Sequence, residues 1–252
     1  METTKPIDTK YTIPDLLLGD DNAKTKKGRQ KGWLTGILYL APSDSSGVMN
    51  TCPSASKGCR AACLFFAGMA VAFPRINLAR INKTKYLNDA PIDFIDHIKS
   101  DIKKLIHKAK ANNEKLCIRL NGTSDLPFYC LKGSNGKSCM EEFPLVQFYD
   151  YTKRISFAQK YASGELPQNY HITFSRSESN QKSVDKVTGL GVNVAAVFLG
   201  KELPAVYKGR KVVNGDANDL RFLDESDVVV GLLAKGALGK KDKTGFCISL
   251  AE

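Results

Sequence analysis

Short apolar runs alternate with helix-length segments along most of this 252-residue chain. Such alternation is typical of parallel strands joined by right-handed crossover helices, and it limits the fold more than any other feature. About seven runs read as strands, which favours a whole or partial (β/α) barrel over a sandwich. The predicted strands are residues 34–40, 116–120, 146–149, 170–174, 192–199, 212–213 and 228–233.

The sequence thus predicts one α/β barrel-like domain over residues 32–252, preceded by a polar, basic extension over residues 1–31. Two helices are predicted ahead of the second strand. The first begins at Pro74, because proline suits a first helical turn. The second begins at Pro91, carries an apolar stripe that includes Phe94, Ile98 and Ile102, and ends near Asn112.

Three of the seven cysteines lie in one loop, residues 50–68, directly after the first predicted strand. Cys52, Cys59 and Cys63 could converge on a soft metal. Their spacing does not fit a zinc ribbon with two CxxC pairs. A three-cysteine site with an open position suits an iron–sulfur cluster or a catalytic zinc. The alternative is three buried, reduced cysteines that act as small apolar residues.

Polar residues follow the predicted strands at what would be their carboxyl ends. In parallel barrels this end carries the active site, because the loops after the strands converge there. Polar residues also follow strands simply because loops are polar, and that alternative stays open. The candidate catalytic residues are Asp125, Asp150, Lys153 and Asp216, and the candidate substrate-binding residues are Asn121, Thr123, Arg176 and Asn214.

The net charge of +11 favours a polyanionic partner, and nucleic acid is the commonest one. Cations cluster in residues 24–33 beside the only tryptophan, so Lys24 and Lys27 are candidate contacts to a phosphate backbone. DNA is favoured over RNA as the partner. A generic basic surface, or a solvated arm, would explain the same charge.

Several classes of protein are disfavoured by the sequence. No P-loop motif is present, and three scattered histidines allow neither a Ser-His-Asp triad nor an HExxH zinc helix. The apolar runs are too short to span a bilayer, and the N-terminus lacks the apolar core of a signal peptide. We therefore expect no membrane partner and a cytoplasmic location. Cys130 and Cys139 flank a Gly/Ser-rich loop that is either a mobile insertion or a source of one more ligand.

Most of the chain resembles the gene product eighty-eight family, which is encoded by phages and plasmids. The resemblance rests on LYLAPSDSSG from residue 38, the three cysteines, RINLARINKT from residue 75, RLNGTSD from residue 119 and YDYTK from residue 149. VVNGDANDLRFLD from residue 212 and LLAKG from residue 232 extend it. The family name implies no particular reaction, but it implies a phage-like setting and hence the host cytoplasm.

Two more distant similarities imply chemistry. Radical S-adenosylmethionine proteins hold a [4Fe–4S] cluster with three cysteines after the first strand of a partial barrel, although with a different cysteine spacing. That similarity implies a cluster on Cys52, Cys59 and Cys63, with or without S-adenosylmethionine. Phage enzymes that exchange guanine for a 7-deazaguanine in DNA are also similar. They imply structural zinc, with Asp125 and Asp150 as base and nucleophile.

The predicted function is a phage-type enzyme, dependent on a metal or iron–sulfur cluster, that modifies nucleic acid or nucleotides. The alternatives are a DNA transglycosylase of the 7-deazaguanine type and a non-catalytic, metal-stabilised nucleic-acid-binding protein. Four carboxylates that follow predicted strands favour catalysis, because negative charge near phosphates gains little for binding alone; they are Asp125, Asp150, Asp216 and Asp219.

Overall fold

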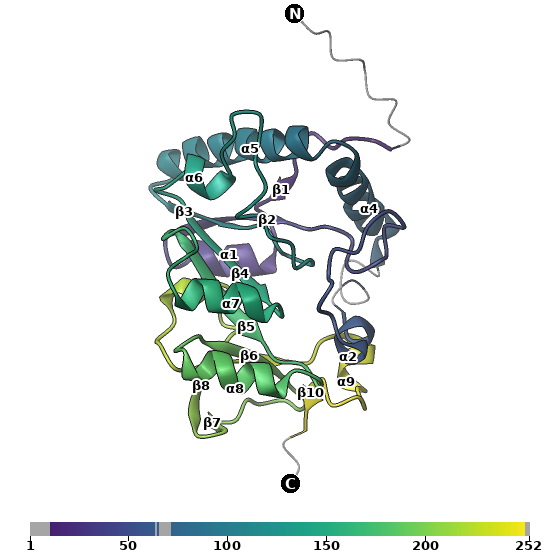
Figure 1. The fold of residues 1–252 in the computed structure, drawn as a ribbon, viewed down its shortest axis with the longest axis vertical. Coiled ribbons are helices and arrows are strands. Elements are labelled where there is room, and N and C mark those ends of the chain that lie inside the picture. Colours follow the sequence, from purple (N-terminus) through teal and green to yellow (C-terminus); the bar gives the residue numbers. More distant parts are fainter. Residues whose placement is uncertain (1–10, 64, 66–71, 250–252) are drawn as a thin grey trace, which may run out of the picture.

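The computed structural model describes residues 11–63, 65 and 72–249. Within these ranges ten strands form a single sheet, shown in Figure 1, in the order β1-β2-β3-β4-β5-β6-β9-β8-β7, with β10 also paired to β6. The strands are β1 (Leu18–Gly19), β2 (Trp33–Leu38), β3 (Lys115–Arg119), β4 (Gln147–Thr152), β5 (Tyr170–Ser175), β6 (Val194–Phe198), β7 (Val206–Tyr207), β8 (Arg210–Asn214), β9 (Val229–Leu233) and β10 (Cys247–Ile248).

Strand direction follows the predicted scheme. The pairs from β2 through β6 to β9 and β8 are all parallel, and so is the pair of β10 with β6. Only β1 and β7 pair in the antiparallel sense. All seven predicted strands are present, with ends shifted by a few residues. The described strands form an open sheet with β1 and β7 at its edges, so a closed barrel is not what the chain forms.

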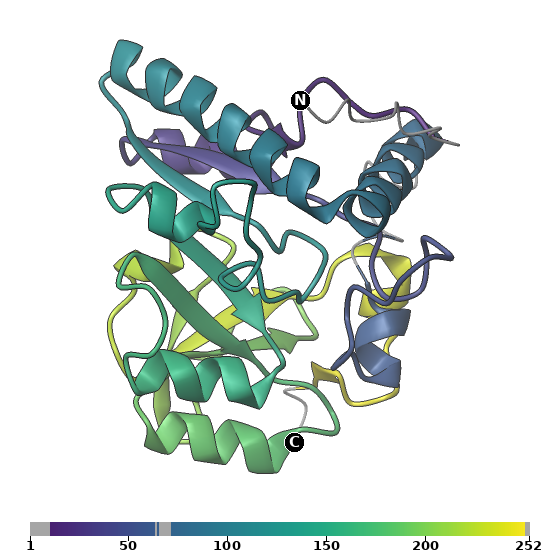
Figure 2. The same ribbon diagram turned by 45° about the horizontal axis from the view of Figure 1, so that its top comes forward.

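Helices join the parallel strands. They are α1 (Ala23–Arg29), α2 (Lys57–Ala61), α4 (Pro74–Asp89), α5 (Pro91–Ala111), α6 (Cys139–Glu142), α7 (Ile155–Ala162), α8 (Gln181–Gly189) and α9 (Gly236–Lys240), with a 3₁₀ turn η2 (Arg221–Leu223). The helices predicted from Pro74 and Pro91 are both present. Figure 2 shows α5 lying along one side of the sheet.

The two faces of the sheet are covered differently. Leu116 and Ile118 of β3 belong to the main core together with the buried stripe of α5, including Phe94 and Ile98. Because side chains alternate along a strand, Cys117 points the other way, where it packs with residues of β4 and of the η2 region. The sheet therefore has a helix-covered face under α5 and a second face that packs against the η2 segment and α1.

The region before β2 belongs to the domain from at least residue 17, whereas the sequence predicted an extension up to residue 31. Leu17 and Leu18 are buried in the main core. Their backbone N–H groups donate to the Asp101 carboxylate on α5, at 2.7 and 3.2 Å. The apolar pair thus anchors this region, and residues 1–10 lie outside the described part of the chain.

The strands are staggered where the site forms. The last two residues of β5 pair with the first two of β6, and β10 pairs with the last two of β6. Strands β6 and β9 are paired along their full length, so both extend beyond the end of β5. The carboxyl edge of the sheet is therefore uneven, because β6 and β9 extend farther than β5.

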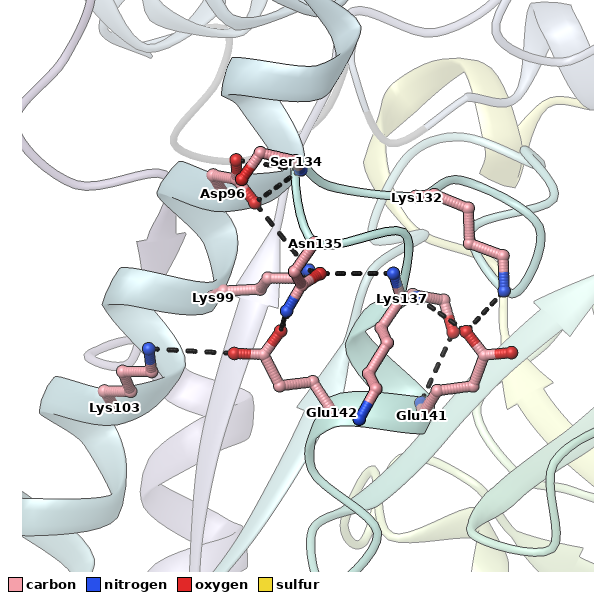
Figure 3. Close-up of polar contacts among 10 residues, drawn as sticks. Asp96, Lys99, Lys103, Lys132, Ser134, Asn135, Lys137, Glu141 and Glu142 are labelled. Carbon is pink, nitrogen blue, oxygen red and sulfur yellow. Dashed lines mark hydrogen bonds and ion pairs between the residues drawn. The ribbon is translucent and has the colours of Figure 1, made fainter.

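The loop between Cys130 and Cys139 is held against α5 by polar contacts (Figure 3). The Lys99 ammonium lies 2.6 Å from the Asn135 side-chain oxygen and 2.9 Å from the Glu142 carboxylate. Ser138 and Glu141 form a capping box that starts α6. Cys139 is buried in the main core and Cys130 is exposed.

Candidate functional site

A cavity of about 620 Å³ opens at the carboxyl edge of the parallel strands. Its lining comes from the segments that follow β2, β3, β4, β5 and β9, and from the taller end of β6. Convergence of these segments is the expected consequence of parallel strands, which all deliver their carboxyl ends to one edge. Cys52, Cys59 and Cys63 all line this cavity.

The first part of the cysteine loop is fixed by contacts to the loop after β3. The Asp125 N–H donates to the Thr51 carbonyl at 2.8 Å, and the Thr51 hydroxyl donates to the Ala41 carbonyl at 2.6 Å. The Cys52 sulfur lies 3.5 Å from the Thr123 carbonyl oxygen. Cys52 is therefore placed directly beside the loop that carries Asp125.

The second cysteine is positioned by a short helix. Ser56 caps α2, and its hydroxyl accepts a hydrogen bond from the Cys59 N–H. The Glu178 carboxylate, after β5, accepts from Gly58 N–H at 2.8 Å and from the Ser56 hydroxyl at 2.7 Å. A Cβ at Gly58 would lie 2.2 Å from the Thr244 side-chain oxygen, so only glycine allows this close approach. Glu178 thus holds α2, and with it Cys59, across the edge of the sheet.

Electrostatic interactions among the three thiols affect the pKa values of Cys52 and Cys63. Burial raises the pKa of Cys63, and the neighbouring Cys59 and Cys52 raise it further. Burial also raises the pKa of Cys52, with smaller contributions from Asp125 and Cys59 in the same direction. These two thiols are therefore protonated at neutral pH unless a cation compensates the negative charge.

Lys153 supplies a cation at this place. Burial lowers its pKa, but Cys59, Asp125 and Cys52 raise it, and the net pKa lies above the usual lysine value. The ammonium group therefore stays charged between the thiols and the Asp125 carboxylate.

Asp125 is buried at the edge of the cavity. Its carboxylate accepts hydrogen bonds from the Thr152 hydroxyl at 2.7 Å and from the Lys153 N–H at 2.9 Å. Burial raises its pKa, and these two hydrogen bonds offset part of the rise. Asp125 therefore exchanges a proton closer to neutral pH than an exposed aspartate does.

Asp150 lies below the cavity and does not line it. It sits within β4, two residues after Phe148, so it faces the helix-covered side of the sheet. Its carboxylate accepts from the Asn121 N–H at 2.7 Å and from the Tyr170 hydroxyl at 2.9 Å. Burial raises its pKa to about 7. Asp150 thus positions Asn121, whose side-chain oxygen accepts from the Leu126 N–H at 2.8 Å and shapes the loop around Asp125.

Asp216 and Arg176 also lie at the cavity. The Asp216 carboxylate accepts from the Leu233 N–H at 2.9 Å and forms an ion pair with Lys235. The Arg176 guanidinium donates to the Phe246 carbonyl at 2.8 Å, which ties the end of β5 to the segment before β10. Asn214 is exposed, and its side-chain oxygen caps the Asp216 N–H at 2.9 Å.

The structure brings most of the predicted site residues together. Those that line the cavity are Cys52, Cys59, Cys63, Asn121, Thr123, Asp125, Lys153, Arg176 and Asp216. Asp150, Asn214 and Lys27 do not line it. The side chain of Lys24 lies outside the described part of the chain.

The sequence analysis missed Arg119 and Glu178. Arg119 lines the cavity, forms an ion pair with Asp219 at 2.8 Å, and stacks over the Tyr151 ring at 4.7 Å. Its only local signal was its place near the end of an apolar run, two residues before Asn121. Asp219 lies 100 residues away in the sequence, so no local pattern could have indicated the pair.

The basic segment before β2 is folded as α1 rather than extended. Lys26 pairs with Asp21 at 3.3 Å, and Arg29 lies 3.5 Å from Asp20. The Lys27 ammonium donates to the Asp216 carbonyl at 2.7 Å. Trp33 packs edge-on against Phe222. These contacts tie the segment to its own domain.

No three Cys, His, Asp or Glu side chains among the described residues are close enough together to hold a metal ion as they stand. The cavity nevertheless gathers the three soft donor atoms together with the cation of Lys153 and the carboxylate of Asp125. No helix in the described ranges is both long and apolar enough to cross a membrane.

The fold and the site define a single-sheet α/β protein with a cysteine-lined cavity at the carboxyl edge of its parallel strands. The chain belongs to the Gene product 88 family, whose model matches residues 16–250. No curated protein and no solved structure matches the chain.

Proposed function

We propose that this protein is an enzyme that holds a metal centre on Cys52, Cys59 and Cys63 and modifies a nucleotide or nucleic acid. One observation carries the proposal: the three thiols line the same cavity as Asp125 and Lys153. The open parallel sheet fits a partial (β/α) barrel, in which active sites lie at this edge. The net charge of +11 favours an anionic substrate, with DNA before RNA among the polymers, in the host cytoplasm.

The donor set fits a thiophilic centre. Three thiolates leave a coordination position open on zinc or on one iron of a [4Fe–4S] cluster. When bound, such a centre supplies Lewis acidity or electron transfer, depending on whether it is zinc or iron–sulfur. Burial keeps Cys52 and Cys63 protonated without a cation, so a positive ion between the thiols would favour their thiolates. Binding would also draw the thiols closer together than they now lie.

The remaining residues have separate roles in this proposal. Lys153 holds a positive charge beside Cys59 and can bind an anionic group of the substrate. Asp125 accepts or donates a proton, since burial moves its pKa toward neutral. Asp150 acts through Asn121 as a positioning residue.

Metal analysis of anaerobically purified protein, with a visible absorption spectrum, tests the proposal. We expect either iron and sulfide with a brown colour, or about one zinc per chain. Replacing Cys52, Cys59 or Cys63 with Ser should remove most of the metal. Cys130→Ser is the matched control, because Cys130 is exposed and lies outside the cavity.

A folded wild-type protein that stays metal-free, under both aerobic and anaerobic purification with iron and zinc supplied, would exclude the metal centre. Equal metal loss in Cys130→Ser would show that the loss is unspecific. With a centre established, Asp125→Asn should abolish turnover while metal content stays unchanged.

A further inference from the structure

The cavity has walls of different chemistry. Val197 of β6 and Leu232 of β9 form an apolar wall, and Phe246 adjoins it. The wall exists because β6 and β9 extend beyond β5 at the carboxyl edge. The polar part of the lining carries the three cysteines and Lys153, of which Cys59 and Lys153 lie next to Phe246. A ligand that matches both sides has an apolar or aromatic body and a polar, charged end.

The charge of the lining indicates an anion. The Arg176 guanidinium donates to the backbone carbonyls of Gly245 and Phe246, so these contacts leave its positive charge uncancelled. The Lys153 ammonium lies 5.6 Å from the centre of the Phe246 ring, so both cations contact the segment before β10. Phosphate and carboxylate groups are the common partners of such a pair.

The volume indicates a small molecule. A cavity of about 620 Å³ lies within the range of ~300–1,000 Å³ that is typical of small-molecule sites. The basic segment of residues 24–33 has fewer unpaired charges for binding a nucleic-acid polymer than its composition suggested. Lys26 and Arg29 are paired with acids of their own chain, and Trp33 packs against Phe222.

We infer that the cavity binds a free nucleoside monophosphate, with its base against Val197 and Leu232 and its phosphate toward Lys153 and Arg176. The choice of a nucleotide among small anionic molecules with a ring rests on the proposed function. The cavity, its apolar wall and its cations do not depend on that proposal. Polymeric nucleic acid is then a competing ligand that the experiment must separate.

Isothermal titration calorimetry on the full chain tests the inference. The four nucleoside 5′-monophosphates, the matching nucleosides, inorganic phosphate and a mixed-sequence single-stranded oligonucleotide are titrated separately. The protein is used as isolated anaerobically and again after chelation. We expect at least one monophosphate to bind more tightly than its nucleoside and than inorganic phosphate, because only the monophosphate contacts both sides of the cavity.

Three variants locate the binding. Lys153→Met and Arg176→Gln should each weaken the monophosphate about tenfold, with little effect on the nucleoside. Val197→Phe should fill the cavity and abolish binding of both. Val206→Phe is the matched control, because Val206 is exposed on the edge strand β7 and does not line the cavity.

The outcomes separate the two proposals. Metal on the cysteines without binding of any monophosphate overturns the ligand assignment and leaves the metal centre standing. Monophosphate binding by a protein that never holds metal supports the ligand assignment and overturns the metal centre. Tight oligonucleotide binding that Val197→Phe leaves unchanged would place the ligand on the outer surface and overturn the cavity assignment.

Discussion

Lys99 on α5 offers a sharp test of how the loop before α6 is held, because a near-identical control lies one helical turn away. The Lys99 side chain is 4% exposed and contacts Glu142 at 2.9 Å and Asp96 at 3.7 Å. Lys103 contacts the same Glu142 carboxylate at 3.6 Å but is 62% exposed. Figure 3 shows both lysines approaching Glu142 from α5.

The expected magnitudes differ because the burial differs. Removing one partner of a buried ion pair costs about 3–5 kcal/mol, since it leaves an uncompensated charge. Glu142 and Asp96 keep 18% and 35% exposure, so their residual hydration places Lys99→Met near the lower end, about 3 kcal/mol. Lys103→Met should cost about 0–1 kcal/mol, as expected for an exposed pair.

Urea denaturation at pH 7 measures both values through the midpoint and slope of the transition. A double variant, Lys99→Met with Glu142→Gln, should recover part of the loss because the unpaired carboxylate is gone. The reasoning is refuted if Lys99→Met and Lys103→Met lose equal stability, or if Lys99→Met loses less than about 1 kcal/mol.

Two further predictions concern pH and the cysteine loop. Burial lowers the pKa of His171 from 6.5 to about 4, so the unfolded chain binds the proton more tightly. Its contribution to stability is therefore complete above pH 6.5 and is lost as the pH falls toward 4. Urea midpoints across this range should change less in His171→Gln than in the wild type, whereas the exposed control His107→Gln should follow the wild type. Glu178→Ala should lower the free energy of unfolding by about 1–3 kcal/mol, because α2 loses two hydrogen bonds. It should also speed alkylation of Cys59 in reduced, metal-free protein. Mass spectrometry of the labelled peptide measures the alkylation rate. An unchanged rate, or an equal rise in the exposed control Glu202→Ala, would show that Glu178 does not position Cys59.

The parallel strands could be predicted because strands buried on both faces read as continuous apolar runs. Strands β1, β7 and β10 could not, since each has only two residues and carries no periodicity. The sequence predicted parallel strands joined by crossovers, but it did not predict that β9 lies between β6 and β8. Closure into a barrel did not follow, because it depends on the pairing of edges far apart in the sequence.

Asp150 shows how a small shift in a strand changes the interpretation of a site. The sequence placed the strand end at residue 149, so Asp150 was expected to project into the cavity. In the structure β4 continues to Thr152, and the Asp150 side chain points to the same face of the sheet as Phe148. Residues on successive strand positions point to opposite faces, so an error in the boundary moves a carboxylate from the cavity to the core. Lys153, just beyond the true strand end, does line the cavity.

The end of the chain completes the cavity that the cysteine loop begins. Figures 1 and 2 both place α9 beside α2, although these helices are far apart in the sequence. Helix α2 also contacts the segment before β10, because a Cβ at Gly58 would lie 2.7 Å from the Phe246 Cβ. Strand β10 can reach this place only because the stagger of β5 and β6 leaves the end of β6 free to pair with it. The position of Cys59 therefore depends on the pairing of a strand that lies about 190 residues later in the chain. No local sequence window spans that distance.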